Sequence, residues 1–418
     1  MPKNISGLIP FLLVAFINAM VDLGHKITIQ NTLFKVYDDA TQVALTAVVN
    51  ALILLPFILL FTPAGFLSDR FAKPKIMRWS ACSAVFITSM ITLCYYQGWF
   101  QAAFGFTFIL AVQSAIYSPA KYGYIREVAD NTQLAPANGF LQATTIIAIL
   151  TGIFVFTIFF ELLLTGQSDL TETNVIRQIA PLGWLLIALS LLELWLTTRL
   201  PRLPAANPAL QYDWQAYRRG YLLRENLKQL RRSTLIWRCI LGLSVFWGVS
   251  QTMLAVFPAF AKMVLNETNT IVIQGLLACS GIGIIVGSLL AGRLCRQAIR
   301  YSLILIGGAG MVIALTAIPS IQNVSGYAIA IIGFGFAGGL FIIPLNALIQ
   351  KTAPKAKLGT ILAGNNWIQN LTMVSFLLVT WIIASYQLSS TLFLQFLPWL
   401  TLILLAPILF KLKKNMRS

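Results

Sequence analysis

An aspartate lies near the middle of the first long apolar stretch of the chain. Asp22 has Asn18 one turn before it and Lys26 one turn after it, so on a helix these side chains share one face. A charge at the centre of a bilayer costs about 2.5 to 3.5 kcal/mol even on mild insertion scales, so such charges usually serve a function. We expect Asp22 to attract an amine or a coupling cation and Lys26 or Lys121 to contact a phosphate. The alternative is an Asp22–Lys26 ion pair that only neutralises itself.

Further polar residues lie in later apolar stretches. Lys121 follows Pro119, where it could meet a central path or simply reach toward the membrane surface. The uncharged candidates for ligand contacts are Asn138, Gln142, Thr145, Asn366 and Asn370. Each of them could equally well bond one helix to another. Glu193 is expected to pair with Arg199 or with a neighbouring helix.

Long apolar helices must position these residues. The chain has 418 residues, of which 58% are hydrophobic and 10% are charged, whereas a soluble domain has roughly 25% charged residues. A membrane-crossing helix needs about 20 apolar residues. Twelve such spans are predicted, near residues 8–33, 43–67, 76–97, 101–119, 138–162, 181–198, 236–261, 271–291, 301–319, 325–348, 362–385 and 390–410. The first is interpreted as a span, since no small-residue cleavage site of a signal peptide follows it.

Basic residues are concentrated in every second connecting segment between the predicted spans. Most of the 30 lysines and arginines fall in the N-terminus, in the gap after each even-numbered span and in the C-terminal tail. Positive charge marks the cytoplasmic loops of membrane proteins. We therefore expect a multi-pass protein of the bacterial inner membrane with both termini in the cytoplasm.

The longest of these basic connections divides the spans into six and six. The prediction is an N-terminal six-helix bundle at 1–200, a linker at 201–235 and a C-terminal six-helix bundle at 236–418. The linker contains a basic amphipathic stretch from Tyr217 to Arg232. It is interpreted as an interfacial helix between the bundles, and it could also bind anionic headgroups or a protein partner.

An internal repeat supports the division into two bundles. Pro119 ends the fourth predicted span and Pro344 lies near the end of the tenth, while Ala137 and Ala363 open the spans that follow. Matching helix breaks in two halves are typical of duplicated transporters whose substrate path runs between the halves.

The sharpest motif is Gly65-Phe66-Leu67-Ser68-Asp69-Arg70-Phe71-Ala72-Lys73-Pro74-Lys75, between the second and third predicted spans. Gly65 permits close helix approach, and Asp69 can hold Arg70 or the terminus of a neighbouring helix. The motif resembles the signature loop of the major facilitator superfamily. This resemblance implies an all-α membrane protein with twelve transmembrane helices in two pseudo-symmetric six-helix bundles. It also implies that Gly65, Asp69, Arg70 and Lys73 serve in gating.

A narrower resemblance comes from Tyr117-Ser118-Pro119-Ala120-Lys121-Tyr122-Gly123 followed by the stretch 137–150. Together they resemble the bacterial lysophospholipid transporter branch of the superfamily, including forms fused to an acyltransferase and an acyl-carrier-protein synthetase. The resemblance implies that lysophospholipid, chiefly lysophosphatidylethanolamine, is flipped by alternating access from the outer to the inner leaflet for reacylation. Such enzymes would then be separate partners of this chain.

The second half of the chain departs from these patterns at two places. Gly292 stands where the acid of the motif would lie, directly before Arg293, so the second latch is expected to be weaker. Phe246-Trp247-Gly248 resembles the lysophospholipid branch, but Gln251 follows where some members carry an arginine.

Other classes of function have little support in the residues. Five cysteines without CxxC spacing and one histidine predict neither a metal site nor a cofactor. The positive charge follows the loops, so no nucleic-acid partner is expected, and no catalytic set of an enzyme is present. Two alternatives remain open. One is an antiporter of drugs or amphiphilic cations that uses Asp22 for proton coupling, and the other is a membrane scaffold that recruits acyltransferases through the linker. For the lysolipid transporter, a coupling sodium ion or proton is considered as a further partner.

Overall fold

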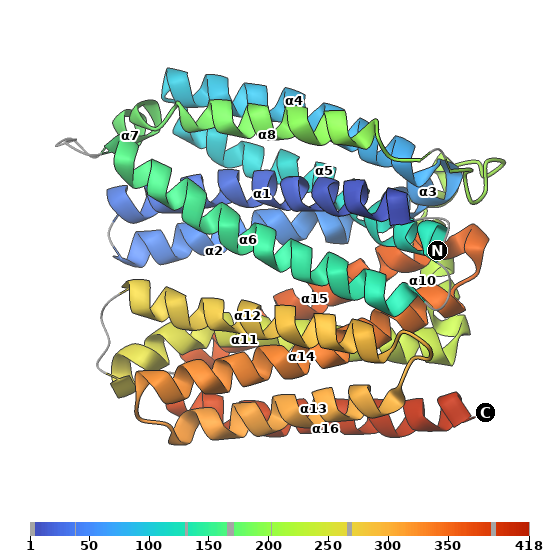
Figure 1. Ribbon diagram of the computed structural model, residues 1–418. Helices are drawn as coiled ribbons and strands as arrows, with labels where there is room; N and C mark the ends of the chain where they lie inside the picture. Colours follow the sequence, from blue (N-terminus) through green and yellow to red (C-terminus); the bar gives the residue numbers. More distant parts are fainter. Residues whose placement is uncertain are drawn as a thin grey trace. The chain divides into compact units, whose positions relative to one another are not determined.

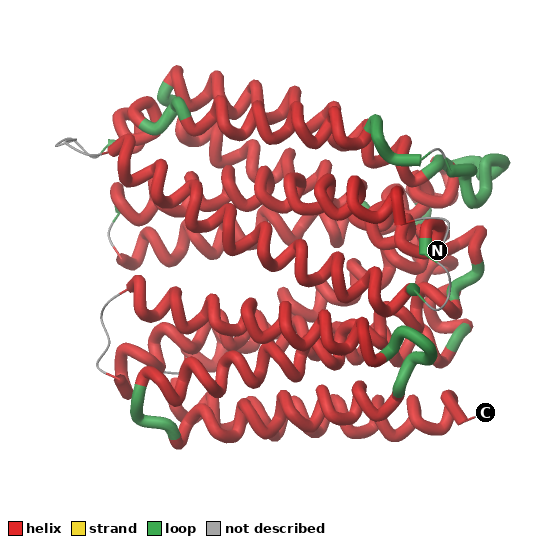
Figure 2. The backbone as a smooth tube through the Cα atoms, in the orientation of Figure 1, coloured by secondary structure: helices red, strands yellow, loops and turns green. Residues whose placement is uncertain are grey.

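The described part of the protein is helical. The computed structural model describes residues 5–37, 39–129, 133–164, 171–201, 203–265, 270–385 and 390–417. Within these ranges the chain forms α-helices joined by loops and two short 3₁₀ turns, without a strand (Figure 2). Contacts between residues group the chain into two compact units, which are described separately below.

The first unit comprises Met1–Val128, Ile147–Arg219 and Lys355–Ala363. Its helices are α1 (Ile5–Val36), α2 (Asp39–Leu59), α3 (Phe61–Arg70), α4 (Lys73–Gln97), α5 (Phe100–Val128), α7 (Glu172–Gln178), α8 (Leu182–Thr197) and α9 (Trp214–Arg218). Helix α8 packs against α1 and α4 (Figure 1). The buried His25 ties α1 to its neighbours, since its Nδ1 lies 2.8 Å from the Tyr95 hydroxyl and its Nε2 lies 3.1 Å from the Ala103 carbonyl oxygen.

The second unit comprises Ala129–Ile146, Gly220–Pro354 and Gly364–Ser418. Its helices are α10 (Tyr221–Arg232), α11 (Thr234–Leu265), α12 (Thr270–Leu294), α13 (Tyr301–Ala317), α14 (Val324–Thr352) and α16 (Ser390–Arg417). Glycines bring α12 and α14 into backbone contact. A Cβ atom at Gly283 would lie 2.1 Å from the Ile332 carbonyl oxygen, and one at Gly335 would lie 2.0 Å from that of Ser280. Small residues of this kind let membrane helices approach closely.

Two helices contribute residues to both units. Helix α6 (Leu134–Leu164) begins in the second unit and continues into the first from Ile147. Helix α15 (Leu358–Ser385) begins in the first unit and continues into the second from Gly364. The two units are defined by contacts between residues. The division of the sequence into domains at 1–200, 201–235 and 236–418 stays a prediction.

The helices confirm the fold expected from the apolar stretches. Nine described helices are long and apolar enough to cross a membrane, and two bent pairs, α2 with α3 and α7 with α8, raise the number to eleven. Helix α15 occupies the position of the eleventh predicted span. The predicted all-α membrane fold is therefore confirmed, and the described helices follow the order of the twelve predicted spans.

The second span is bent, because α2 and α3 meet at an angle of 57° at Leu60. One local expectation about these helices was wrong. The prolines do not break their spans, since α5 continues through Pro119 to Val128 and α14 through Pro344 to Thr352. A proline removes a single N–H donor, and neighbouring helices can hold such a helix together beyond it.

Candidate functional site

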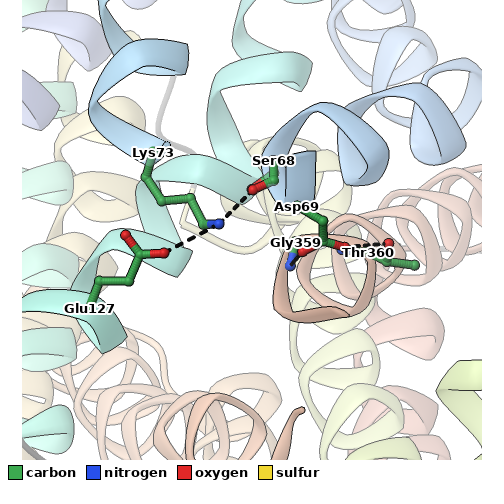
Figure 3. A network of polar contacts seen from close by, with 6 residues as sticks. All are labelled: Ser68, Asp69, Lys73, Glu127, Gly359 and Thr360. Atoms are coloured by element: carbon green, nitrogen blue, oxygen red, sulfur yellow. Dashed lines mark hydrogen bonds and ion pairs between the residues drawn. The ribbon is translucent and has the colours of Figure 1, made fainter. Parts of the chain in front are cut away.

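The motif of the second span lies against the first turn of α15, within the first unit. Asp69 is 1% exposed and accepts three hydrogen bonds (Figure 3). The donors are the backbone N–H of Gly359 at 2.6 Å, the backbone N–H of Thr360 at 2.9 Å and the Thr360 hydroxyl at 2.7 Å. The first N–H groups of a helix have no partner inside the helix and carry partial positive charge, so they favour a carboxylate. Of the two partners expected for Asp69, the structure shows the helix terminus.

Gly65 permits this contact. A Cβ atom at position 65 would lie 2.8 Å from the Thr360 Cα and 3.3 Å from the Ala363 Cβ, so the α3 backbone lies directly on α15. The expected role of Gly65 in close helix approach thus has a steric basis, since a larger residue would push the two backbones apart.

We expect Gly65→Ala to loosen this contact. The added methyl group would meet backbone atoms that cannot rotate away, and overpacking of this kind costs about 1 to 3 kcal/mol. Hydrogen exchange of the Gly359 and Thr360 amides should become roughly tenfold faster. Gly105→Ala is the control, because nothing lies within 4 Å of a Cβ atom at that position. Equal protection of the two amides in both variants would contradict the steric role of Gly65.

The basic residues of the motif have different surroundings. Lys73 is fully buried, donates to the Ser68 carbonyl oxygen and forms an ion pair with Glu127 of α5 at 3.3 Å (Figure 3). Arg70 lies over two rings of its own segment, 5.6 Å from the centre of Phe66 and 5.5 Å from that of Phe71. Lys73 is therefore built into the bend between α3 and α4, while Arg70 makes cation–π contacts.

The segment that follows α8 lies on the same motif. The Asn207 N–H donates to the Asp69 carbonyl oxygen at 2.9 Å, and the Tyr212 ring lies 4.8 Å from the Phe66 ring. Tyr212 also contacts Trp214 and Tyr217 through ring edges and tilted faces. Burial, and to a lesser degree Tyr217, raises the pKa of Tyr212 to about 12, so its hydroxyl stays neutral at ordinary pH. This part of the linker is held to α3.

The corresponding contact in the second unit contains no carboxylate. A Cβ atom at Gly139 of α6 would lie 2.6 Å from the Ser288 carbonyl oxygen of α12, and one at Gly292 would lie 3.1 Å from the Pro136 Cα. Gly292 replaces the acid at a place where a Cβ atom would be tightly packed against the backbone of α6. Arg293 follows it and is exposed in the last turn of α12. The contact between α6 and α12 therefore depends on packing.

A second polar group lies inside the first unit, between α1, α5 and α8. The Ser114 hydroxyl donates to Oδ2 of Asp22, whereas the buried Oδ1 has no hydrogen-bond partner. Lys121 is the cation that acts electrostatically on Asp22, and its Nζ lies 5.3 Å from the centre of the Tyr122 ring. Among the described residues no ion pair joins Asp22 to Lys26, so the self-neutralising pair is not present.

Asn18 and Glu193 are also buried inside the first unit. Asn18 is 4% exposed and Glu193 is fully buried in α8. The expected pairing of Glu193 with Arg199 was wrong, because the Arg199 guanidinium lies over the Trp195 ring at 4.9 Å. Glu193 instead has Asp22 and Lys121 as electrostatic neighbours.

The remaining predicted site residues lie in the second unit. Asn138 donates to Gln350 at 2.6 Å and accepts from it at 3.0 Å, which joins α6 to α14 through paired amides. Gln142 is buried, and the Thr145 hydroxyl bonds back to the Leu141 carbonyl oxygen. Asn370 donates to the Asn366 carbonyl oxygen at 2.8 Å, so these two do share a helical face.

Several residues of these groups were not expected from the sequence. Ser114 lies two turns before Lys121 on α5, a spacing that places both on one face and could have suggested it. Glu127 and Gln350 carry no such signal, because their partners Lys73 and Asn138 are distant in sequence.

Buried carboxyl groups and a lysine inside apolar helices of the first unit are typical of a multi-pass membrane protein of the transporter class. The chain belongs to the Major Facilitator Superfamily, whose family model matches residues 11–377. The lysophospholipid transporter LplT of Serratia proteamaculans is 27% identical over 353 residues, which cover 81% of this chain and 79% of the relative. The transporter of that name from an Escherichia coli strain is 27% identical over 327 residues, covering 76% and 74% of the two chains. Both resemblances seen in the sequence are thereby confirmed.

Solved structures agree on the fold. The human organic anion transporter MFSD10 superposes with a TM-score of 0.76 at 12% identity, covering 99% of this chain and 100% of that chain. The proton:xylose symporter XylE superposes with a TM-score of 0.71 at 16% identity, covering 98% and 96%. At such low identity these likenesses concern the fold alone.

Proposed function

We infer that this protein is a lysophospholipid flippase of the bacterial inner membrane. It moves lysophospholipids, chiefly lysophosphatidylethanolamine, from the outer to the inner leaflet by alternating access of two bundles, with both termini in the cytoplasm. The relatives named as lysophospholipid transporters support the substrate class. The observation that carries the inference is the buried Asp22 with Lys121 as its electrostatic partner inside apolar helices.

The chemistry of a lysolipid matches this pair. The substrate has one acyl chain, an anionic phosphate and, in the ethanolamine form, a cationic amine. Asp22 offers an unpartnered carboxylate oxygen to the amine, and Lys121 offers an ammonium to the phosphate. Asn18 and Lys26 lie on the same helix and remain candidates for further contacts, as do the amide and hydroxyl residues of the second unit.

The contact between α3 and α15 supplies the gate in this proposal. Asp69 binds the first turn of α15, and Gly65 lets the two backbones meet. Opening this end of the path requires those hydrogen bonds to break, so their strength sets the balance between two conformations. Arg70 and Lys73 stabilise the motif, and Arg293 lies beside the packing contact of the second unit. Reacylation of the flipped lipid would fall to separate acyltransferase or acyl-carrier-protein synthetase partners.

Transport can be measured directly in proteoliposomes. With labelled lysophosphatidylethanolamine in the outer leaflet, the full-length protein should make the label disappear into the inner leaflet faster than in empty liposomes. The assay should be run without a gradient and with a sodium or a proton gradient. Equal rates in protein-containing and empty liposomes under all three conditions would exclude the flippase.

A second candidate is an antiporter of cationic drugs or amphiphiles. The observation that favours it is the same buried Asp22, which can bind a cation without any phosphate. Uptake of a cationic dye that exceeds lysolipid uptake in the same vesicles would establish this function instead. We expect the lysolipid to be preferred, because Lys121 would repel a purely cationic substrate.

A further inference from the structure

A groove lies between α13 and α16 of the second unit. The two helices pack against each other, and the start of α13 lies at the same end as the C-terminus of α16 (Figure 1). The groove has a volume of about 470 Å³ and is lined along α13 from Tyr301 to Ile313. The side chains that line it are apolar apart from Tyr301, whose hydroxyl donates to the Leu409 carbonyl oxygen at 2.6 Å. Such a lining suits a hydrocarbon chain.

The groove opens on a surface that faces lipid. Helices α13 and α16 are both long and apolar enough to cross a membrane. Ala309 of α13 and Ala406 of α16 line the groove with small, exposed side chains. Ile313 and Phe410, which also line it, are 69% and 76% exposed. Exposed apolar residues on membrane-crossing helices contact acyl chains of the bilayer, so the groove is accessible to them.

The length of the groove matches one leaflet. At about 1.5 Å per residue, the helix rises about 18 Å from Tyr301 to Ile313. The hydrocarbon core of a bilayer is about 30 Å thick, so one leaflet contributes about 15 Å. Tyr301 is also the first residue of α13. A phospholipid whose headgroup lies beside Tyr301 can therefore place one acyl chain along the whole groove.

Positive charge gathers at the Tyr301 end of the groove. Arg300 directly precedes Tyr301 and is exposed. Arg238 of α11 donates to a backbone carbonyl oxygen in the last turns of α16 at 2.7 Å. Lys413 follows Leu409 by four positions on α16, a spacing that puts it on the groove side of that helix. Three cations thus come from three helix ends to the place where a headgroup would lie.

The surrounding helices contain no acid to balance these cations. Helices α11 to α16 have neither aspartate nor glutamate in their sequences. In α10, Glu225 lies 3.8 Å from Lys228 of the same helix. Basic residues beside a gap between membrane helices are the pattern that recognises anionic lipid headgroups. The charge and the apolar groove therefore point to the same kind of ligand.

We propose that this groove binds an anionic phospholipid of the bilayer, with one acyl chain between α13 and α16 and the headgroup phosphate at Arg300 and Lys413. Burial of the chain supplies affinity, and the cations supply selectivity. A zwitterionic phospholipid offers the same phosphate, but its own cationic group is repelled by these residues. The inference needs only the membrane fold of the second unit and is independent of the proposed transport function.

Photo-cross-linking in a bilayer tests this site. The full-length protein is reconstituted into phosphatidylcholine vesicles that contain a small amount of phosphatidylglycerol with a photoreactive group on one acyl chain. A parallel sample contains phosphatidylcholine with the same photoreactive chain. After illumination, mass spectrometry identifies the labelled peptides. The groove residues of α13 and α16 should be labelled roughly 10- to 30-fold more by phosphatidylglycerol, because each surface cation raises the affinity roughly fivefold.

Two double variants test the acyl chain and the headgroup separately. Ala309→Phe with Ala406→Phe fills the groove at two exposed positions and should abolish its labelling by both lipids. Arg300→Gln with Lys413→Gln leaves the groove open and should reduce labelling by phosphatidylglycerol to the level of phosphatidylcholine.

A matched control removes two cations of α10. Lys228 has Glu225 beside it, and Arg231 lies over the Trp237 ring at 5.1 Å. Lys228→Gln with Arg231→Gln should keep the preference of the groove for phosphatidylglycerol. A preference lost in this control as well would reflect general surface charge and overturn the site.

Three other results would also contradict the proposal. Equal labelling of the groove by the two lipids would refute its selectivity for anionic headgroups. Labelling that persists after the groove has been filled would place the acyl chain elsewhere. Cross-links between two copies of the protein through α13 and α16, in place of lipid, would assign the groove to a dimer interface.

Discussion

Asp69→Ala should lower the rate of lysolipid transport by roughly 10- to 100-fold. The substitution leaves the Gly359 and Thr360 N–H groups and the Thr360 hydroxyl without their acceptor in a buried place. Hydrogen bonds to a charged group contribute about 1.5 to 3 kcal/mol each, and each 1.4 kcal/mol is a factor of ten in a population. Proteoliposome transport rates, together with hydrogen exchange at the start of α15, measure both consequences.

The chain offers a matched control for this substitution. Asp213 also caps a helix, accepting from the Gln215 and Ala216 N–H groups at 2.9 Å, but it is exposed and lies outside the motif. Asp213→Ala removes an ordinary cap that contributes about 1 kcal/mol and should leave transport nearly unchanged. The gating role of Asp69 would be refuted if the two variants transported equally well.

Asp22→Asn should reduce transport of lysophosphatidylethanolamine by roughly tenfold or more. The neutral amide keeps the size of the side chain but no longer attracts an amine, and a charge-assisted bond is about twice as strong as a neutral one. Transport of lysophosphatidylglycerol should fall much less, because it presents no amine to Asp22. The ratio of the two rates in the same proteoliposomes is the quantity to measure. Equal losses of transport for the two lipids would mean that Asp22 maintains the structure of the first unit and does not bind the amine.

A double variant separates the two remaining explanations for Asp22. If Asp22 only neutralises Lys121, then Asp22→Asn combined with Lys121→Gln restores neutrality and should regain much of the activity. If each residue binds one end of the headgroup, the double variant should be at least as inactive as either single variant. Recovery of transport would therefore count against the binding role of both residues.

The sequence was most informative where length and composition decide the outcome. Inside a bilayer, a run of about 20 apolar residues can satisfy its backbone hydrogen bonds on its own only as a helix. The number and order of the helices could therefore be predicted. Pro119 was misleading. A proline breaks an isolated helix, but α5 is packed against other helices and continues through Pro119 to Val128. The bend at Leu60 has a local signal in Pro56 and Pro63, which flank it, but the apolar residues continue on both sides, so the stretch was predicted as one span.

The candidate site was predictable only in part, and for a similar reason. Asp22 was found because a charge inside an apolar span is costly and therefore conspicuous, whereas Asp69 was found because its motif resembles the signature loop of the superfamily. Their partners lie far along the chain, and nothing in the local pattern points from Asp69 to Gly359 or from Asn138 to Gln350. Of the two partners expected for Glu193, Arg199 was chosen by proximity in sequence, but residues six positions apart do not face each other on a helix. The electrostatic neighbours of Glu193 lie on neighbouring helices, which was the other expectation.

The segment at 203–213 looks like an ordinary connecting loop, yet it is anchored at two points. Asn207 bonds to the Asp69 carbonyl oxygen, and Tyr212 lies on Phe66. Loops in general accept insertions and deletions easily. Here the six residues from Asn207 to Tyr212 must keep their number so that both anchors are reached. Natural variation in loop length, and any engineered tag, should therefore be disfavoured between Asn207 and Tyr212.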